Sequence, residues 1–278
     1  MGRTIFVVKG RLLIINKLKV ILQGVLVAIP LIISMVLPVD LLWEVFGLVA
    51  DRNFGGIKNQ IYEIVPNKKI IALFIGLILS IVVLILFRFF NKDKIFNVGN
   101  KHFDFHMNYF ILSRFLGYKK ITLVGIPLYL QFKLLFKETF ECSNSDSHPE
   151  EIDEPKIITQ NIDDKGDEIN LILSDTYLIK LDDLPDDKMN LPTLIIERTN
   201  GFSGVRTYNR KFVEGVRKQT HEYHLKYKRV NVFATTNTQN TKEIVLQSFK
   251  NRGRTGFKEI HVYVQNSDRK FQRSHLIR

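Results

Sequence analysis

Two uninterrupted apolar stretches lie near the start of the chain. The stretches at 20–39 and 70–87 contain no charged residue, and a helix needs about 20 mainly apolar residues to cross the core of a bilayer. A buried core helix has a similar composition, but two such runs so close together favour membrane spans. The first run is too long for a cleavable signal peptide, and no clear small-x-small cleavage site follows it. We therefore predict two transmembrane helices, over about 20–39 and 70–90.

The lysines and arginines that flank these spans predict their orientation. Residues 1–19 carry five Lys and Arg and no acid, and four more bases follow the uncharged run 70–87, from Arg88 to Lys101. The intervening loop, 40–69, balances four acids with four bases. Loops rich in Lys and Arg stay in the cytoplasm, so both termini are expected there. Within the loop, VDLLWEVFGLVA with Trp43 predicts a short amphipathic helix on the outer membrane surface.

Small and weakly polar residues occur within both spans. The first contains Gly24 and Ser34, and the second contains Gly76 and Ser80. Such residues let membrane helices approach closely and form hydrogen bonds to one another. The runs 20–39 and 70–87 have no ionisable residue, which argues against a proton relay or voltage sensor within one chain. A simple anchor and a pore formed by several chains both fit these segments.

The polar remainder divides into three parts by composition. Residues 91–141 include KKITLVGIPLYLQFKLLF, which predicts two strands, or a strand and a short helix. Residues 142–168 are acidic and aromatic-free, which predicts a loop or disordered linker. Residues 169–278 regain regular patterns and are expected to form the cytosolic domain. With residues 1–90 as a transmembrane hairpin, the chain has four predicted parts.

Strand and helix patterns alternate within this last part. Four apolar runs predict strands: INLILSD, LPTLIIERTNG, RVNVFATTN and KEIHVYVQN. Apolar residues at helical spacing over 208–228 and 241–250 predict helices between them. Strands that alternate with helices of about ten to twenty residues indicate a parallel α/β sheet. The fold class that we predict is two transmembrane helices followed by a small Rossmann-like α/β domain.

Charge is distributed unevenly over the polar part. Residues 138–187 contain three Lys and Arg and sixteen Asp and Glu, a net charge of −13. Residues 197–278 contain eighteen Lys and Arg and six Asp and Glu, a net charge of +12. A basic face can bind anionic lipid, nucleic acid or a phosphorylated ligand, and part of it can balance the acidic segment.

Candidate ligand-binding residues follow the predicted strands. In open α/β sheets, ligands bind beyond the carboxyl ends of the strands. The expected site consists of mostly polar residues at the ends of the first three strands, together with Arg206, which follows the second strand. The end of the fourth strand adds the polar residues Gln265 and Asn266. The expected ligand-binding residues are Asp175, Arg198, Thr199, Asn200, Gly201, Arg206, Thr235, Thr236, Asn237 and Asn240.

Two loops contain most of these residues. TTNTQNTKE follows a strand and opens a helix, where free backbone N–H groups can bind an anion. A simpler interpretation is that Thr238 or Asn240 only caps that helix. In RTNGFSGVR, the glycines permit a close backbone approach, and Arg198 and Arg206 can neutralise phosphate. The alternative for this loop is a surface turn that contains glycine.

The sequence lacks the motifs of a catalytic or metal site. It has neither GxGxxG nor the P-loop lysine pattern, so a dinucleotide cofactor or ATP hydrolysis is poorly supported. The pairs His102/His106 and His221/His224 have no evident third ligand. The single cysteine, Cys142, excludes an intramolecular disulfide. We expect no catalytic residue, no metal and no cofactor.

The plan of the chain resembles the two-transmembrane effectors of bacterial nucleotide-signalling (CBASS-like) antiphage systems. The resemblance rests on the apolar runs at 20–39 and 70–87 and on the loops RTNGFSG and TTNTQN. It implies that the cytosolic domain senses a nucleotide, and that the membrane part oligomerises and breaches the inner membrane. Some members carry a β-barrel sensor instead, and the helices predicted over 208–228 and 241–250 do not fit that version.

Three functions follow from this organisation. The first is a non-enzymatic sensor–effector in the bacterial inner membrane. Its ligand would be a cyclic oligonucleotide or another nucleotide that drives association into a homo-oligomer and thereby perturbs the lipid bilayer. The alternatives are a membrane-tethered enzyme that acts on nucleotides or nucleic acid, and a membrane-anchored adaptor whose basic face binds a partner protein.

Overall fold

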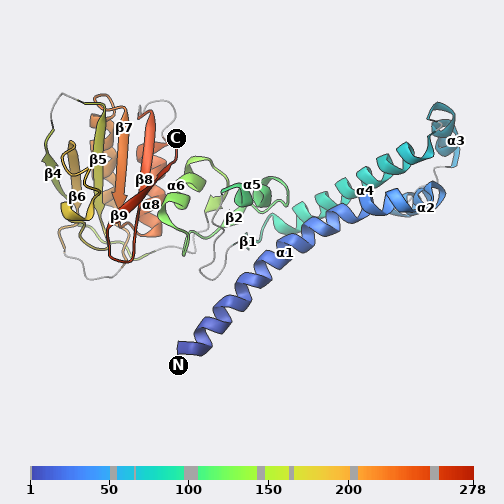
Figure 1. The fold of residues 1–278 in the computed structure, drawn as a ribbon, viewed down its shortest axis with the longest axis horizontal. Coiled ribbons are helices and arrows are strands. Elements are labelled where there is room, and N and C mark those ends of the chain that lie inside the picture. Colours follow the sequence, from blue (N-terminus) through green and yellow to red (C-terminus); the bar gives the residue numbers. More distant parts are fainter. Residues whose placement is uncertain are drawn as a thin grey trace. The chain divides into compact units, whose positions relative to one another are not determined.

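A computed structural model describes most of the chain (Figure 1). The described residues are 2–50, 55–65, 67–96, 106–142, 148–162, 166–200, 206–250 and 257–278. The structure divides into two compact units. The first comprises Met1–Phe96 and Met107–Lys120, and the second comprises Asn97–His106 and Ile121–Arg278.

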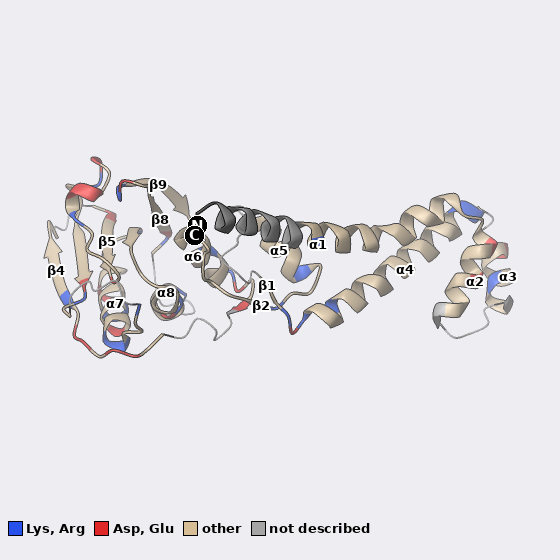
Figure 2. Ribbon diagram, turned by 90° about the horizontal axis from the view of Figure 1, so that it is seen from below, with Lys and Arg blue, Asp and Glu red and all other residues tan. Residues whose placement is uncertain are grey.

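Two long helices dominate the first unit. They are α1 (Gly2–Val36) and α4 (Lys68–Asn91). Leu18–Val36 of α1 and all of α4 are long and apolar enough to cross a membrane, by length and composition. Figure 2 shows both helices free of charged residues along most of their described length. Both predicted apolar helices are therefore present.

Helices α1 and α4 pack against each other in opposite directions. Ser34 lies beside Gly76, and Gln23 bonds to Asn91 at the other end of α4. A Cβ atom at Gly76 would lie 2.6 Å from the Cβ of Ser34 and 3.0 Å from the carbonyl oxygen of Pro30. The absence of a side chain at Gly76 therefore permits the close contact between the helices.

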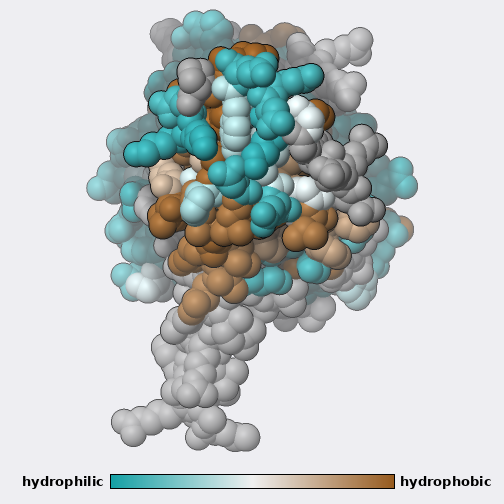
Figure 3. All heavy atoms as spheres, turned by 90° about the vertical axis from the view of Figure 1, so that its right-hand side faces the viewer, coloured by the Kyte–Doolittle hydropathy of each residue, from teal (hydrophilic) through white to brown (hydrophobic). Residues whose placement is uncertain are grey.

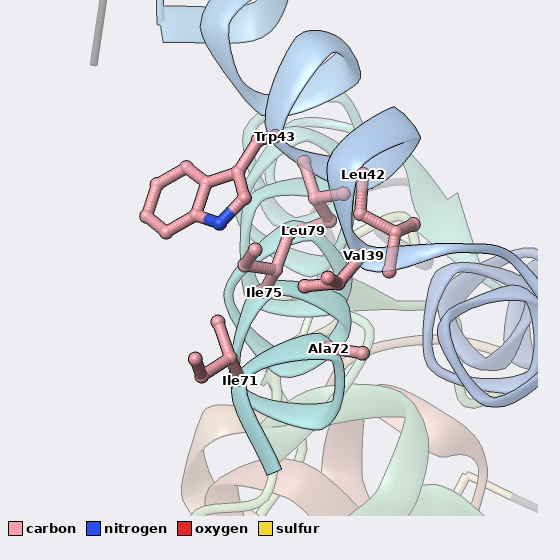
Figure 4. Close-up of a cluster of buried hydrophobic side chains, with 7 residues drawn as sticks. All are labelled: Val39, Leu42, Trp43, Ile71, Ala72, Ile75 and Leu79. Carbon is pink, nitrogen blue, oxygen red and sulfur yellow. The ribbon is translucent and has the colours of Figure 1, made fainter. Parts of the chain in front are cut away.

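A hydrophobic cluster joins α2 (Val39–Ala50) to α4. Figure 4 shows its seven buried residues, Val39, Leu42, Trp43, Ile71, Ala72, Ile75 and Leu79. The helix predicted for this loop is thus present, and it is followed by α3 (Gly55–Ile64), which was not predicted. Figure 3 views the end that carries α2 and α3 and shows hydrophilic and hydrophobic side chains side by side.

Shorter elements follow α4 and precede β4 in the sequence. They are β1 (Ile95–Phe96), α5 (His106–Arg114), β2 (Lys120–Ile121), α6 (Leu128–Phe136) and β3 (Glu141–Cys142). The KKITLVGIPLYLQFKLLF segment contains β2 and α6, so it forms a strand and a short helix, the second of the two predicted alternatives.

The second unit contains a six-stranded mixed sheet in the order β4-β6-β5-β7-β8-β9. The strands are β4 (Lys156–Gln160), β5 (Glu168–Ser174), β6 (Thr193–Glu197), β7 (Arg229–Ala234), β8 (Glu259–Gln265) and β9 (Phe271–Leu276). The four predicted strands form its parallel centre, β6-β5-β7-β8. The carboxyl ends of these four strands therefore lie along one edge of the sheet.

Both outer strands are antiparallel to their neighbours and differ from the sequence prediction. The pattern predicted a loop at 142–168, yet β4 pairs with β6 there. The basic C-terminal segment forms β9 against β8. Edge strands are half exposed and rich in polar residues, so their composition resembles that of a loop. The observed sheet is therefore mixed rather than purely parallel.

Three helices pack among the described residues of the sheet unit. They are α6, α7 (Arg210–Tyr223) and α8 (Thr238–Ile244), which continues as a π-helix, η3 (Val245–Phe249). The predicted helices at 208–228 and 241–250 thus exist with shifted ends. A core cluster on one face of the sheet includes Ile172, Ile195 and Phe233. The segment around the short 3-10 helix η2 (Leu181–Asp183) packs against this cluster.

Candidate ligand-binding site

A pocket of about 590 Å³ lies at the carboxyl ends of β5, β7 and β8. Its size is within the range of small-molecule sites in proteins. The residues that line it are Gly125, Ile126, Pro127, Leu128, Gln131, Thr176, Tyr177, Arg206, Ala234, Thr235, Thr236, Asn237, Thr238, Tyr263, Val264, Gln265 and Asn266. The pocket thus lies where ligands bind in open parallel sheets.

Four of the expected ligand-binding residues line this pocket. They are Arg206, Thr235, Thr236 and Asn237. Gln265 and Asn266, from the fourth strand end, line it as well. The segments that follow β5, β7 and β8 meet at the pocket because these strands are adjacent and parallel, so that their carboxyl ends share one edge of the sheet.

Asp175 lies beneath the pocket and holds its wall in place. Its Oδ2 accepts hydrogen bonds from the backbone N–H of Asn237 at 3.0 Å and from the amide of Asn240 at 2.9 Å. Burial raises the pKa of the Asp175 carboxyl, and these bonds and the charge of Arg198 oppose that rise. With 1% of its surface exposed, Asp175 is a support for the site rather than a ligand contact.

Asn237 has two structural roles at the start of α8. Its side-chain oxygen accepts from the backbone N–H groups of Gln239 and Asn240, which makes it the N-cap. A capping residue was predicted here, but the cap is Asn237 instead of Thr238 or Asn240. The Asn237 amide also donates to the carbonyl of Thr207 at 2.8 Å. This bond fixes the backbone next to Arg206 at the pocket.

Arg198 is buried in an ion-pair network and does not line the pocket. Its side chain is only 4% exposed and pairs with Glu151, and its Nη1 lies 3.7 Å from Asp175. Its Nε lies 3.9 Å from Asp153. A hydrogen bond from Thr207 and then Arg198 itself lower the pKa of the Glu151 carboxyl. The guanidinium therefore interacts with carboxylates of its own domain and not with the pocket.

The remaining expected residues surround this network. Thr199 and Asn200 donate backbone N–H bonds to Asp153, each at 3.2 Å. The Thr199 hydroxyl donates to the carbonyl of Glu154 at 2.7 Å. These residues hold the acidic segment before β4 against the end of β6. Gly201 lies outside the described residues.

One wall of the pocket comes from a segment that the strand-end argument did not include. Residues 125–127 directly precede α6, and Leu128 and Gln131 belong to it; this segment comes before all six strands of the large sheet in the sequence. Tyr177 and Tyr263 add aromatic rings. The Gly125-x-Pro127 break marks a turn before the helix, but it contains no polar signature that indicates a site.

Arg206 is the one charged side chain among the described residues that line the pocket. It is exposed and has no ion pair to the described residues, unlike the buried Arg198. The other polar groups in the lining are hydroxyls and amides. Such a lining suits an anion with few charges and several hydrogen-bonding groups. No cluster of His, Cys, Asp or Glu in the described parts could hold a metal ion.

The fold and the pocket define a protein with two long apolar helices and a separate α/β unit with a polar site. A family model for the SMODS- and ubiquitin-system-associated 2TM effector domain matches residues 12–277. The chain therefore belongs to this family of two-transmembrane effectors of nucleotide-signalling defence. The resemblance to two-transmembrane effectors, which was inferred from the sequence, is thereby confirmed.

Solved structures give a weaker similarity. The Acinetobacter baumannii Cap4 SAVED/CARF-domain receptor with the cyclic trinucleotide 2'3'3'-cAAA is 11% identical with a TM-score of 0.44, and covers 62% of this chain and 41% of that one. The same receptor with 3'3'3'-cAAA is 13% identical with a TM-score of 0.43, and covers 61% and 41%. The chain thus spans about two fifths of those receptors. No curated protein sequence gave a significant match.

Proposed function

We propose that this chain is a sensor–effector of the bacterial inner membrane, whose Rossmann-like domain binds a nucleotide-type ligand. The pocket at the ends of β5, β7 and β8 is the site. Ligand binding promotes association of chains, and the paired spans then perturb the membrane. The observation that carries this proposal is Arg206, an exposed arginine with no ion pair to the described residues, in a pocket whose other described lining residues are uncharged.

The pocket chemistry supports a nucleotide with a phosphate near Arg206. A guanidinium forms charge-assisted bonds to phosphate oxygens. No carboxylate among the described lining residues competes with a phosphate for Arg206. The hydroxyls of Thr235 and Thr236 and the amides of Asn237 and Gln265 suit a ribose or a base edge. Asp175 and Asn240 support this wall from beneath, through the hydrogen bonds to Asn237 described above.

We expect Arg206→Ala to weaken ligand binding by about ten- to a hundredfold. A bond to a charged group contributes about 1.5–3 kcal/mol, and each 1.4 kcal/mol is about tenfold in affinity. Calorimetry on the full chain in detergent, with a panel of cyclic di- and trinucleotides, measures this. Arg217→Ala, an exposed arginine on α7, is the matched control and should bind like the wild type.

Two results would contradict the proposed site. If none of the nucleotides binds to the wild-type chain, the adaptor function becomes the better explanation. If a nucleotide binds but Arg206→Ala and Arg217→Ala weaken it equally, the ligand binds the general basic surface rather than this pocket.

The proposed arrangement in the membrane has both termini in the cytoplasm. The basic residues before the first span and after the second support it, and α2 and α3 then lie on the outer side. Reporter fusions at residue 55 and at the C-terminus are expected to give a periplasmic and a cytoplasmic signal. A cytoplasmic signal at residue 55 would exclude this topology.

A further inference from the structure

One wall of the ligand pocket contains a buried amide oxygen without a partner. Gln131 lines the pocket and is 6% exposed, and its side-chain oxygen Oε1 has no hydrogen-bond partner among the described residues. Buried polar atoms of proteins are nearly always paired, so an unpaired one requires an explanation. An unpaired acceptor in the wall of a pocket is explained if the molecule that binds there supplies the donor.

The orientation of this amide is fixed by the turn before α6. The Nε2 atom of Gln131 donates to the carbonyl of Ile126 at 2.7 Å. Because a carbonyl oxygen only accepts, the amide nitrogen must face Ile126, and Oε1 then faces away from it. The backbone N–H of Gln131 donates to the carbonyl of Pro127 at 3.0 Å, which holds the residue on the same turn. Rotation of the amide would break the bond to Ile126, so Oε1 stays an acceptor.

Two aromatic contacts hold α6 within the sheet unit. Tyr129 stacks on His275 of β9 with ring centroids 3.7 Å apart. Phe132 packs against Phe249 of η3 with ring centroids 5.8 Å apart. The wall that contains Gln131 is thus positioned by neighbours in its own unit. An acceptor that is already ordered favours binding, because little side-chain entropy is lost when a ligand donates to it.

The surroundings of Gln131 suit the base of a nucleotide. The lining residues 125–128 are apolar, whereas Arg206 is the charged side chain among the described lining residues. A phosphate is therefore favoured near Arg206, and a flat, weakly polar base is favoured near the α6 wall. Thr238 also lines the pocket with a buried hydroxyl that has no partner among the described residues. A hydroxyl can donate or accept, so Thr238 does not discriminate between bases, whereas Gln131 does.

An acceptor selects among bases by the groups at their edges. Adenine and cytosine present an exocyclic amino group, which is a hydrogen-bond donor. Hypoxanthine and uracil have a carbonyl oxygen at the same ring position, and this oxygen would face Oε1 without a bond. A site built to pair with an N–H group rejects the analogue that lacks it, because the buried polar atom of the site is then left unpaired.

We propose that Gln131 is a specificity-determining residue, whose Oε1 accepts a hydrogen bond from the amino group of a base such as adenine or cytosine. This inference rests on the proposed function, because it concerns the ligand of the same pocket. It adds the class of base, which the charge of Arg206 and the hydroxyl groups of the lining do not determine.

The test measures base preference by calorimetry on the full chain in detergent. Cyclic di- and trinucleotides built from adenosine or cytidine are compared with the same rings built from inosine or uridine, in which an oxo group replaces each amino group. We expect the wild type to bind at least one amino ring about ten- to a hundredfold more tightly than its oxo counterpart, because the oxo ring leaves a buried acceptor unpaired.

Two substitutions at Gln131 separate the acceptor from the bond to the turn. Gln131→Met keeps a long, unbranched side chain without an amide, and the preference should fall to within about threefold, through weaker binding of the amino ring. Gln131→Glu keeps an acceptor oxygen but replaces the NH₂ group that donates to Ile126. It should keep a preference of at least about tenfold even where its charge weakens binding of both rings. Gln272→Met, at an exposed position on β9, is the matched control and should keep the wild-type preference.

A wild type that binds nucleotides without preferring an amino ring to its oxo counterpart would overturn the role of Gln131 and leave the proposed function intact. The role is also overturned if Gln131→Met weakens both rings alike, or if the Met and Glu variants lose the preference equally. The bond to Ile126 would then be the whole role of Gln131. Binding of no nucleotide to the wild type would instead contradict the proposed function itself, and this inference with it.

Discussion

Arg198→Ala is expected to destabilise the α/β unit by about 3–5 kcal/mol, because it leaves buried carboxylates without their cation. Asp153 and Asp175 are 3% and 0% exposed at their side chains, and the Arg198 guanidinium is their shared ion-pair partner. An uncompensated buried charge is among the largest single effects of a point mutation. The effect on ligand binding would then be an indirect consequence of lost folding.

Urea-dependent hydrogen exchange of the full chain, read from peptides that cover β5 and β7, measures this change. Arg217→Ala is the matched control and should stay within about 0.5 kcal/mol of the wild type. Arg206→Ala should resemble Arg217→Ala in stability while it loses ligand binding. Equal stability of Arg198→Ala and Arg217→Ala would contradict the structural role assigned to the buried network.

Gly76→Leu is expected to disrupt the packing of α4 against α1. Overpacking a close contact costs about 1–3 kcal/mol and sometimes more, and the backbone carbonyl of Pro30 cannot move aside as a flexible side chain can. Trp43, the single tryptophan, packs in the α2–α4 cluster and reports on the position of α4. Its fluorescence during a denaturant titration in detergent should show a lower midpoint.

Gly24→Leu supplies the control on the other long helix. A Cβ atom at Gly24 meets no other atom within 4 Å among those described, so a side chain there has open space in the single chain. The sequence suggested the same packing role for both glycines, and the structure separates them. Identical midpoints for the two variants would contradict the packing observed at Gly76.

The elements that the sequence predicts best are those with strong apolar patterns. The two long helices and the strands β5, β6, β7 and β8 follow from runs that must be buried or inserted in lipid. The edge strands β4 and β9 were missed because one side of each faces solvent, so polar residues such as Lys156 and Arg273 are tolerated.

Sequence reasoning located the edge of the sheet where the pocket lies but could not assign roles within it. Thr235, Thr236 and Asn237 line the pocket because they follow a central parallel strand. The two arginines of RTNGFSGVR look equivalent in sequence, yet Arg198 is buried among acids and Arg206 is exposed. Two partners of Arg198, Glu151 and Asp153, lie in the acidic segment before β4, and only the fold brings that segment to the end of β6.

The wall formed by α6 could not be predicted for a different reason. Residues 125–131 are about fifty to one hundred and forty positions from the other lining residues in sequence, and they are mostly apolar. No local pattern distinguishes an apolar helix start that lines a ligand site from one that fills a core. Its position in the pocket is a property of tertiary packing.

The most direct test of the account is nucleotide-dependent permeability of vesicles that contain the full chain. A panel of cyclic di- and trinucleotides is added to lipid vesicles loaded with a fluorescent dye, with the wild type and Arg206→Ala compared side by side. We predict rapid dye release by the wild type with at least one nucleotide, and release at least about tenfold weaker for Arg206→Ala at the same concentration. Release that needs no nucleotide, or that is equal in the two proteins, would contradict a membrane effector controlled through this pocket.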